Sequence, residues 1–261
     1  MRAVRCLLQT LLIVLAAGLL GQAGRADAQA PRAAAPAPPS DTVTIAVLGD
    51  SLADGVWGGL YRQLIHDKRH IVQRNAKNSV GLAAGSLMDL VDGAIQRGRP
   101  EAAIMMVGAN DRISIFVDNR PVARLGTPAW RQYYFARISN FMERMARESI
   151  PVVWITPPVI RSPEADADGR LIADLIRDAA SGRDNVWVLD ARPLSTDESG
   201  QYRSHYKDLG GRMTLMRADD GIHFTPPGYE ILSSHALGVL RSNLSAFAQA
   251  PSPLTAVSAA R

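Results

Sequence analysis

The stretch of sequence that most constrains the fold is VTIAVLGDSLADGVWGG, at positions 43–59. It begins as a continuous apolar run, and after Gly49-Asp50-Ser51 it continues directly as a glycine-spaced helical pattern. A strand that is apolar on both faces is typical of a parallel sheet that is covered on both sides. We therefore expect Ser51 at the carboxyl end of a buried strand and at the start of a helix.

Apolar runs of this kind recur along the chain, and helical patterns separate them. The strand candidates are 42–49, 70–74, 101–108, 151–157 and 185–190, and the helix candidates are 53–68, 87–98, 127–145, 170–180 and 227–247. This alternation predicts an α/β fold with a mostly parallel sheet. Residues 196–220 interrupt it, and their Ser-Gly and Gly-Gly pairs predict a hairpin-like excursion before the last helix. No internal repeat or second domain is apparent.

The N-terminal segment 1–28 has the pattern of a secretory signal peptide. Two arginines precede an apolar run at 7–20, and an Ala-x-Ala site ends at Ala28. The run is shorter than the about 20 apolar residues that a spanning helix needs, so a cleaved leader is favoured over a membrane anchor. We therefore expect a periplasmic or secreted protein with no stable membrane span after processing.

Composition sets the boundaries of the folded domain. Residues 29–41 are rich in proline and alanine, so we expect a linker there, followed by one domain over 42–249 and a flexible tail at 250–261.

Cleavage of the leader would remove Cys6, the single cysteine, which excludes disulfides, zinc–thiolate sites and a cysteine nucleophile in the mature protein. It would also remove three arginines and one aspartate, which lowers the net charge from +4 to +2. A charge that small indicates neither nucleic acid nor an anionic membrane as a partner.

A serine that acts as a nucleophile needs a base, and the base needs an orienting partner. Among the five histidines, His223 stands out because it lies in RADDGIHFTPPGY, directly before the start of a helix. Asp220 precedes it by three residues, and a tight turn at Gly221 would let this carboxylate reach one imidazole nitrogen. Asp219 is a possible alternative orienter, although a turn role fits it better.

A second strand end, MMVGANDR at 105–112, offers a donor for an oxyanion. The side-chain amide of Asn110 and a backbone N–H at Gly81 could both donate there, although each residue also fits an ordinary turn or loop. The glycines of 49–59 form neither a phosphate-binding G-x-x-x-x-G-K-[ST] loop nor a dinucleotide-binding G-x-G-x-x-G motif.

Taken together, the blocks GDSLADG, NSVG, GAND and DGIH occur in the order in which they occur in the SGNH, or GDSL, hydrolases. The resemblance covers 43 to about 245, and it is closest to an exported bacterial subgroup of uncharacterised SGNH hydrolases. It implies a three-layer α/β/α sandwich, flavodoxin-like, with a mostly parallel sheet of about five strands. It also implies that Ser51 is the nucleophile, His223 the general base and Asp220 its orienter. The oxyanion hole would be the N–H groups of Ser51 and Gly81 and the side chain of Asn110, and no metal or organic cofactor is expected.

The function that this resemblance implies is ester hydrolysis through an acyl-Ser51 intermediate. Since export would place the domain beside O-acetylated glycans, we expect an O-acetylesterase that acts on cell-envelope or other carbohydrate. The residues expected to contact the substrate are Arg112, Tyr202, Tyr206 and Arg217. A lysophospholipase or thioesterase, an acyltransferase that uses the same triad, and a catalytically silent binding protein of the envelope are the alternatives.

Overall fold

The protein is described by a computed structural model that covers residues 42–84 and 87–248. The predicted signal peptide, linker and tail lie outside the described residues, so their assignments remain predictions. Within the two described ranges, no helix combines the length and the apolar character that crossing a bilayer requires.

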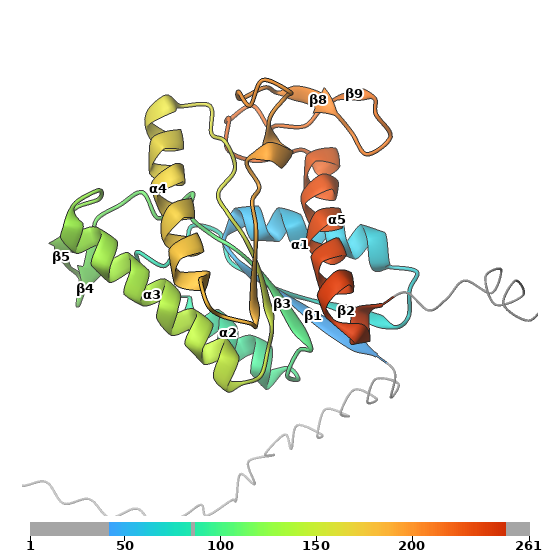
Figure 1. The fold of residues 1–261 in the computed structure, drawn as a ribbon, viewed down its shortest axis with the longest axis horizontal. Coiled ribbons are helices and arrows are strands. Elements are labelled where there is room, and N and C mark those ends of the chain that lie inside the picture. The colour runs from blue at the N-terminus through green and yellow to red at the C-terminus, as the bar shows by residue number, and fades with distance from the viewer. Residues whose placement is uncertain (1–41, 85–86, 249–261) are drawn as a thin grey trace, which may run out of the picture. The chain divides into compact units, whose positions relative to one another are not determined.

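A five-stranded parallel sheet forms the centre of the structure, in the strand order β2-β1-β3-β6-β7 (Figure 1). The strands are β1 (Val43–Gly49), β2 (His70–Ala76), β3 (Ala102–Met106), β6 (Val152–Ile155) and β7 (Val186–Leu189). Each strand corresponds to one of the predicted apolar runs. The predicted fold class is therefore confirmed.

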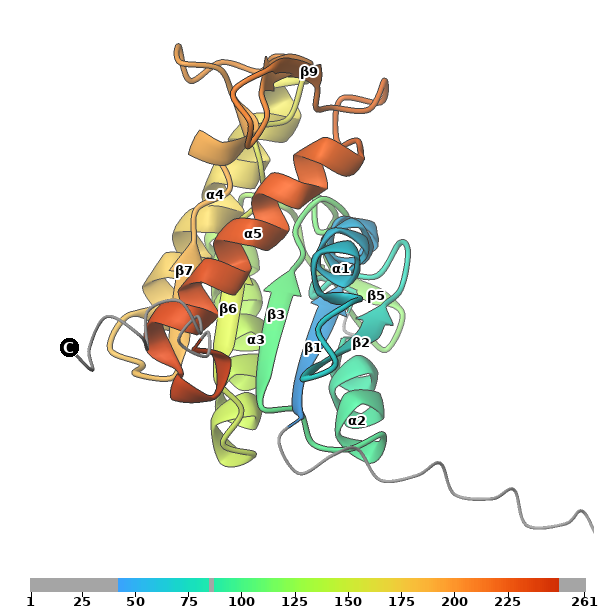
Figure 2. The same ribbon diagram turned by 90° about the vertical axis from the view of Figure 1, so that its right-hand side faces the viewer.

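Helices cover both faces of this sheet, as the apolar character of its strands requires. The helices are α1 (Ser51–Leu64), α2 (Met88–Gln96), α3 (Pro128–Arg147), α4 (Pro163–Ala180) and α5 (Pro226–Asn243). Alternate strand residues face opposite sides, so Ile45 and Val47 pack with α1 and α5, whereas Ala46 and Leu48 pack with α2, α3 and α4. Figure 2 looks onto the face that α1 and α5 cover.

The excursion predicted at 196–220 is present as a short antiparallel hairpin, β8 (His205–Lys207) and β9 (Met213–Leu215), and it follows the 3₁₀ turn η1 (Pro193–Ser195). A second hairpin, β4 (Ile115–Val117) and β5 (Arg120–Ala123), was not predicted. Its turn residues Asp118 and Asn119 have φ angles of 48° and 61°. Another 3₁₀ turn, η2 (Ser245–Phe247), follows α5.

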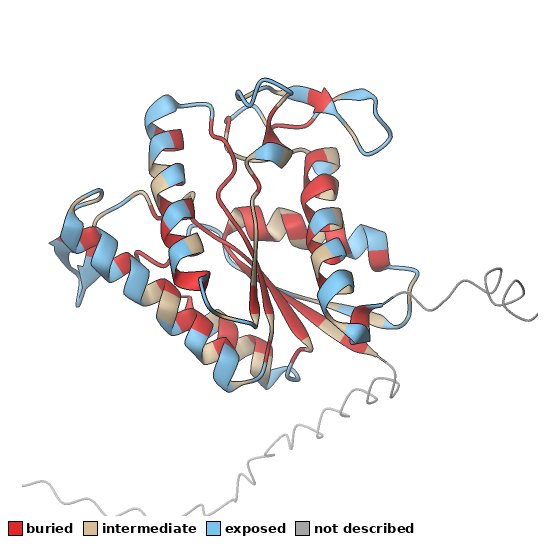
Figure 3. Cartoon of the chain, in the orientation of Figure 1, coloured by how far each residue is buried: buried red, intermediate tan, exposed pale blue. Residues whose placement is uncertain are grey.

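Helix α4 begins earlier than the sequence pattern predicts. Its first residue is Pro163 rather than Arg170, because the Ser162 side chain accepts a hydrogen bond from the N–H of Ala165 and caps the first turn. Proline at the first helical position has no N–H that would need a partner. The connection before this helix is buried from 152 to 160, as Figure 3 shows for the segment that joins β6 to α4.

Helices α1 and α5 pack closely because glycines of α1 leave room for the side chains of α5. A Cβ atom at Gly55 would lie 2.0 Å from the ring of Tyr229, whereas a Cβ atom at Gly58 would lie 3.4 Å from Arg62 Nη1 and touch nothing else. The two glycines occupy the same helix but different surroundings. Gly55 is therefore required by packing, and Gly58 is not.

We predict that Gly55→Ala destabilises the protein by about 1–3 kcal/mol, because the added methyl group overpacks the contact with Tyr229. Gly58→Ala is the matched control and should stabilise α1 by up to about 1 kcal/mol, since alanine has the higher helix propensity. Urea unfolding of both variants measures the difference. Equal stabilities for the two would contradict the packing argument.

Candidate active site

The turn between β1 and α1 brings Ser51 to the carboxyl edge of the sheet. A Cβ atom at Gly49 would lie 2.0 Å from the carbonyl oxygen of Met106, so only glycine lets β1 pass this close to the end of β3. The Asp50 side chain then accepts a hydrogen bond from the N–H of Leu52 at 2.8 Å and caps α1. The sequence Gly-Asp-Ser thus closes the strand, starts the helix and makes Ser51 the first residue of that helix.

Ser51, His223 and Asp220 form a continuous hydrogen-bonded relay. The Oγ atom of Ser51 lies 2.7 Å from Nε2 of His223, and Nδ1 of His223 lies 2.6 Å from Oδ2 of Asp220. Gly221, with a φ of 76°, turns the chain between the carboxylate and the imidazole. This arrangement is that of a nucleophile, a base and an orienting carboxylate.

The short loop that carries His223 also fixes its orienting carboxylate. The Oδ1 atom of Asp220 accepts hydrogen bonds from the N–H groups of Ile222, at 2.8 Å, and His223, at 2.9 Å. Partial burial raises the pKa of Asp220, but these two bonds and the contact with the His223 ring outweigh it and lower the pKa to about 2. Asp220 is therefore ionised wherever an imidazole could act as a base.

Gly81 and Asn110, two of the residues predicted for the oxyanion hole, lie on loops that contact each other, and Asn110 contacts the residue before Ser51. Asn110, in the turn after β3, donates from Nδ2 to Oδ2 of Asp50 at 3.2 Å, and an amide carries a second N–H hydrogen that can donate elsewhere. Gly81 lies against the neighbouring residue, because a Cβ atom there would be 2.1 Å from Oδ1 of Asp111. The loops of Gly81 and Asn110 are thus in direct contact.

Asp111 is a positioning residue that the sequence motifs do not single out. Its carboxylate is fully buried and accepts hydrogen bonds from the N–H of Ala83, at 2.7 Å, and from the hydroxyl of Tyr134, at 2.8 Å. Arg137 donates to the carbonyl oxygens of Leu82, at 2.6 Å, and Ala83. Together these side chains fix the loop that carries Gly81.

Two buried carboxylates therefore lie beneath the site. Burial is the main cause that raises the pKa of Asp50 to about 7 and that of Asp111 to about 6, and the Coulombic repulsion from Asp111 adds to the increase at Asp50. Neither carboxylate has an arginine or lysine as a hydrogen-bond partner among the described residues.

Throughout 42–84 and 87–248, no group of three or more His, Cys, Asp or Glu side chains is placed to hold a metal ion.

Two of the four residues predicted to contact the substrate are buried, so that prediction is wrong for them. Tyr206, on β8, is 6% exposed and packs against Met216 and Ile231. Arg217 is fully buried, and its guanidinium group is occupied by backbone carbonyl groups. Arg217 has no exposed surface for a ligand, and the pocket that Tyr206 lines contains none of Ser51, Asp220 and His223. Their burial depends on contacts between the excursion and other parts of the fold, and the local sequence pattern of the excursion does not show these contacts.

The other two predicted contacts remain accessible. Arg112 follows the Asn110 turn and pairs with Asp168 of α4, with 3.1 Å between Nε and Oδ2 and about a third of its side chain exposed. Tyr202 lies at the edge of the excursion, where its hydroxyl accepts a hydrogen bond from Arg161 at 3.1 Å. Either side chain can face a bound molecule, so their predicted role remains open to test.

Comparisons with known proteins agree with this geometry. The family described as "Protein of unknown function (DUF459)" matches residues 44–238. A lipase/acylhydrolase from Enterococcus faecalis is 15% identical, with a TM-score of 0.55 over 77% of this chain and 96% of that chain. An acetyl xylan esterase is 16% identical, with a TM-score of 0.55 over 76% of this chain and 100% of that chain. A lipolytic protein assigned to the G-D-S-L family, from Desulfitobacterium hafniense, is 15% identical, with a TM-score of 0.54 over 75% and 98%.

At these identities the solved structures establish the fold, which is that of the GDSL, or SGNH, hydrolases. A comparison with curated protein sequences gives no match.

We predict that Asp111→Asn changes the pH dependence of stability between pH 4 and 6. In this interval the folded wild type retains a proton on Asp111 that the unfolded chain has released, so its free energy of unfolding falls as the pH rises. Relative to the variant, which cannot titrate, the fall amounts to about 3 kcal/mol at most. Urea unfolding at pH 4, 5, 6 and 7 measures it.

The exposed Asp184→Asn variant is the control, and its curve should follow that of the wild type. Parallel pH curves for the wild type and Asp111→Asn would show that the buried carboxyl does not titrate as described.

Proposed function

The chain belongs to the DUF459 family and has the fold of the SGNH hydrolases, and from these premises we propose that it is a serine esterase that acts through an acyl-Ser51 intermediate. The observation that carries the proposal is the relay from Ser51 through His223 to Asp220, with distances of 2.7 and 2.6 Å. A serine hydroxyl bonded to an imidazole that is itself bonded to a carboxylate is the arrangement needed for nucleophilic attack on an ester.

In the proposed first step, Nε2 of His223 accepts the proton of the Ser51 hydroxyl as Oγ attacks the ester carbonyl. Asp220 keeps the imidazole oriented and stabilises the imidazolium that forms. The negative charge on the carbonyl oxygen is stabilised by the N–H groups of Ser51 and Gly81 and by the amide of Asn110. His223 then protonates the leaving alcohol, and the acyl group remains on Ser51.

In the second step, water replaces the alcohol. His223 accepts a proton from the water as its oxygen attacks the acyl carbonyl, and the proton returns to Ser51 when the acid leaves. The start of α1 at Ser51 supports both steps, because the partial positive charge of a helix N-terminus stabilises a nearby oxyanion.

For the substrate, we propose an O-acetylated carbohydrate, either in the cell envelope or outside the cell. The predicted signal peptide supports this choice, since it would deliver the domain to the compartment in which such esters are abundant. An acetyl xylan esterase is among the proteins that share the fold. The partly exposed Arg112 is a candidate contact for the sugar.

We predict that Ser51→Ala lowers the hydrolysis of p-nitrophenyl acetate by at least about 10³-fold, because it removes the nucleophile. The same variant should no longer be labelled by a fluorophosphonate probe. Ser234→Ala, on the outer part of α5, is the matched control and should keep full activity and labelling. Full activity in Ser51→Ala would refute the proposed mechanism.

We further predict that acetyl esters are hydrolysed faster than butyryl esters, and these faster than long-chain esters, and that acetate is released from acetylated xylan or peptidoglycan. Rates that rise with chain length would instead indicate a lysophospholipase or thioesterase. Acetyl transfer to added glycan that outpaces hydrolysis would indicate an acyltransferase. An absence of fluorophosphonate labelling would favour a catalytically silent binding protein.

A further inference from the structure

Arg217 is fully buried although it carries a charge. Its Nη1 atom donates to the carbonyl oxygens of Val159, at 2.8 Å, and Ser195, at 3.2 Å. On the other side, Nη2 donates to the carbonyl oxygen of Ile222, at 3.0 Å, and Nε makes a longer bond of 3.4 Å to that of His223. A buried charge needs partners for its donors, and here four carbonyl groups from three segments provide them. The side chain therefore connects the loop of the catalytic histidine to two other segments.

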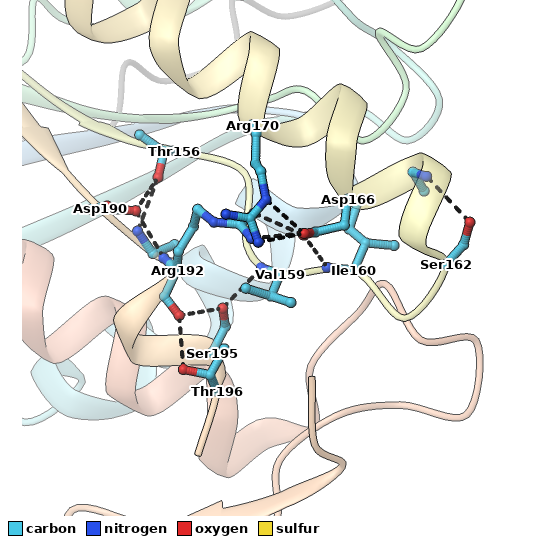
Figure 4. Close-up of polar contacts among 12 residues, drawn as sticks. Thr156, Val159, Ile160, Ser162, Asp166, Arg170, Asp190, Arg192, Ser195 and Thr196 are labelled. Atoms are coloured by element: carbon cyan, nitrogen blue, oxygen red, sulfur yellow. Dashed lines mark hydrogen bonds and ion pairs between the residues drawn. The ribbon is translucent and has the colours of Figure 1, made fainter. Parts of the chain in front are cut away.

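The two segments on the far side of Arg217 are themselves rigidly held (Figure 4). Asp166 and Arg192 form a bidentate ion pair, in which both N–O distances are 2.8 Å and each side chain is 12% exposed. Asp166 also accepts a hydrogen bond from the N–H of Ile160 at 3.1 Å, and the Ser195 hydroxyl accepts one from the N–H of Val159 at 3.0 Å. These contacts thus hold the loop after β6 and the turn η1 against each other and against α4. The two segments provide the carbonyl groups of Val159 and Ser195 that Arg217 binds.

Aromatic rings determine the orientation of the Arg217 guanidinium group. Its central carbon lies 4.3 Å from the ring centre of Phe224 and 4.9 Å from that of Tyr202. Arg161 also lies over the Tyr202 ring, at 5.2 Å, and donates to the carbonyl oxygen of Asp219 at 2.8 Å. Planar guanidinium groups stack on aromatic faces, a contact that lysine cannot reproduce. The excursion, through Tyr202, therefore contacts both arginines that bind the catalytic loop.

We propose that Arg217 is a positioning residue, which holds the backbone of His223 at the place from which its ring reaches Ser51. This inference rests on the proposed function. The ring of His223 is hydrogen-bonded to Ser51 and Asp220. The backbone that carries this ring is held by Arg217, which donates to the carbonyl oxygens of Ile222 and His223. Without the guanidinium group, the loop keeps its contacts with Arg161 but loses its link to the carbonyl groups of Val159 and Ser195. A displacement of about 1 Å at the reacting groups can cost about 100-fold in rate.

The decisive variant is Arg217→Lys. Lysine keeps the charge but lacks the planar guanidinium group, whose N–H groups reach carbonyl oxygens of the His223 loop and of the two other segments at once. We expect kcat for p-nitrophenyl acetate to fall by about 10- to 100-fold, with KM changed by less than about twofold, because the reacting groups rather than the substrate are displaced. The rate of fluorophosphonate labelling of Ser51 should fall in parallel with kcat.

Tyr202 provides a second variant in case Arg217→Lys does not fold. Tyr202→Ala removes one stacking face and should lower kcat by about fivefold with KM changed by less than about twofold, because the reacting groups rather than the substrate are displaced. Leu240→Ala, in the core at the far end of α5, is the control for lost stability and should lower the melting temperature without lowering kcat. If Arg217→Lys and Tyr202→Ala behave like Leu240→Ala, the inference is overturned.

A measurement that needs no activity separates this inference from the proposed function. In the ¹H NMR spectrum, the proton between Nδ1 of His223 and Asp220 should give a far-downfield signal that shifts or disappears in Arg217→Lys but not in Leu240→Ala. If the wild type neither hydrolyses esters nor reacts with the probe, the proposed function fails while this signal still reports the position of the ring. An unchanged signal in Arg217→Lys would overturn the positioning role.

Discussion

The parallel pairing of β1 with β3 is the constraint on which the rest of the structure depends. Gly49 pairs with Met106 at the last position of this ladder, and the absence of a Cβ atom lets the two strand ends approach closely. Because parallel strands end at the same edge of a sheet, the residues that follow them, Ser51 and Asn110, meet there. The packing of α5 on α1 then adds the loop that carries His223. The site is thus assembled from elements whose positions are determined by strand pairing and helix packing rather than by contacts among the reacting groups.

The electrostatics of the site depend on two carboxyl groups that do not belong to the triad. Asp50 and Asp111 are buried, and burying a carboxylate is costly unless hydrogen bonds compensate. Most of the compensating donors belong to the segments around Ser51: the first turn of α1 and Asn110 for Asp50, and the loop after Gly81 for Asp111, which also accepts from Tyr134 of α3. The cost of burial is therefore offset only while these loops keep their positions. The two carboxyl groups therefore stabilise one arrangement of the loops that carry the proposed oxyanion donors, in addition to any effect on the stability of the fold.

The sequence carried enough information to predict the sheet, the helices and the relay, because each depends on local patterns or on short blocks. Apolar runs marked every strand of the sheet, and Asp220 and His223 lie within one turn of each other. The β4–β5 hairpin was missed because most of its strand residues are exposed and no buried apolar run marks it, although Asp118-Asn119 is a recognisable turn. Arg217 and Tyr206 were misplaced for a different reason. They lie in a polar segment that looks exposed, and their burial arises from contacts with the loop after β6, with η1 and with α5 that no local pattern encodes.

The distance along the chain between the nucleophile and its base has a consequence for the biogenesis of the protein. Ser51 and His223 are separated by 172 positions, whereas the base and its orienting carboxylate are separated by three. The second contact can form within one turn, but the first requires that a very long loop is closed by the docking of α5, the last α-helix of the described chain. A nascent polypeptide therefore has no complete triad until α5 has been synthesised and has docked on α1. Such a protein remains chemically inert during translation and during any transport in an unfolded form.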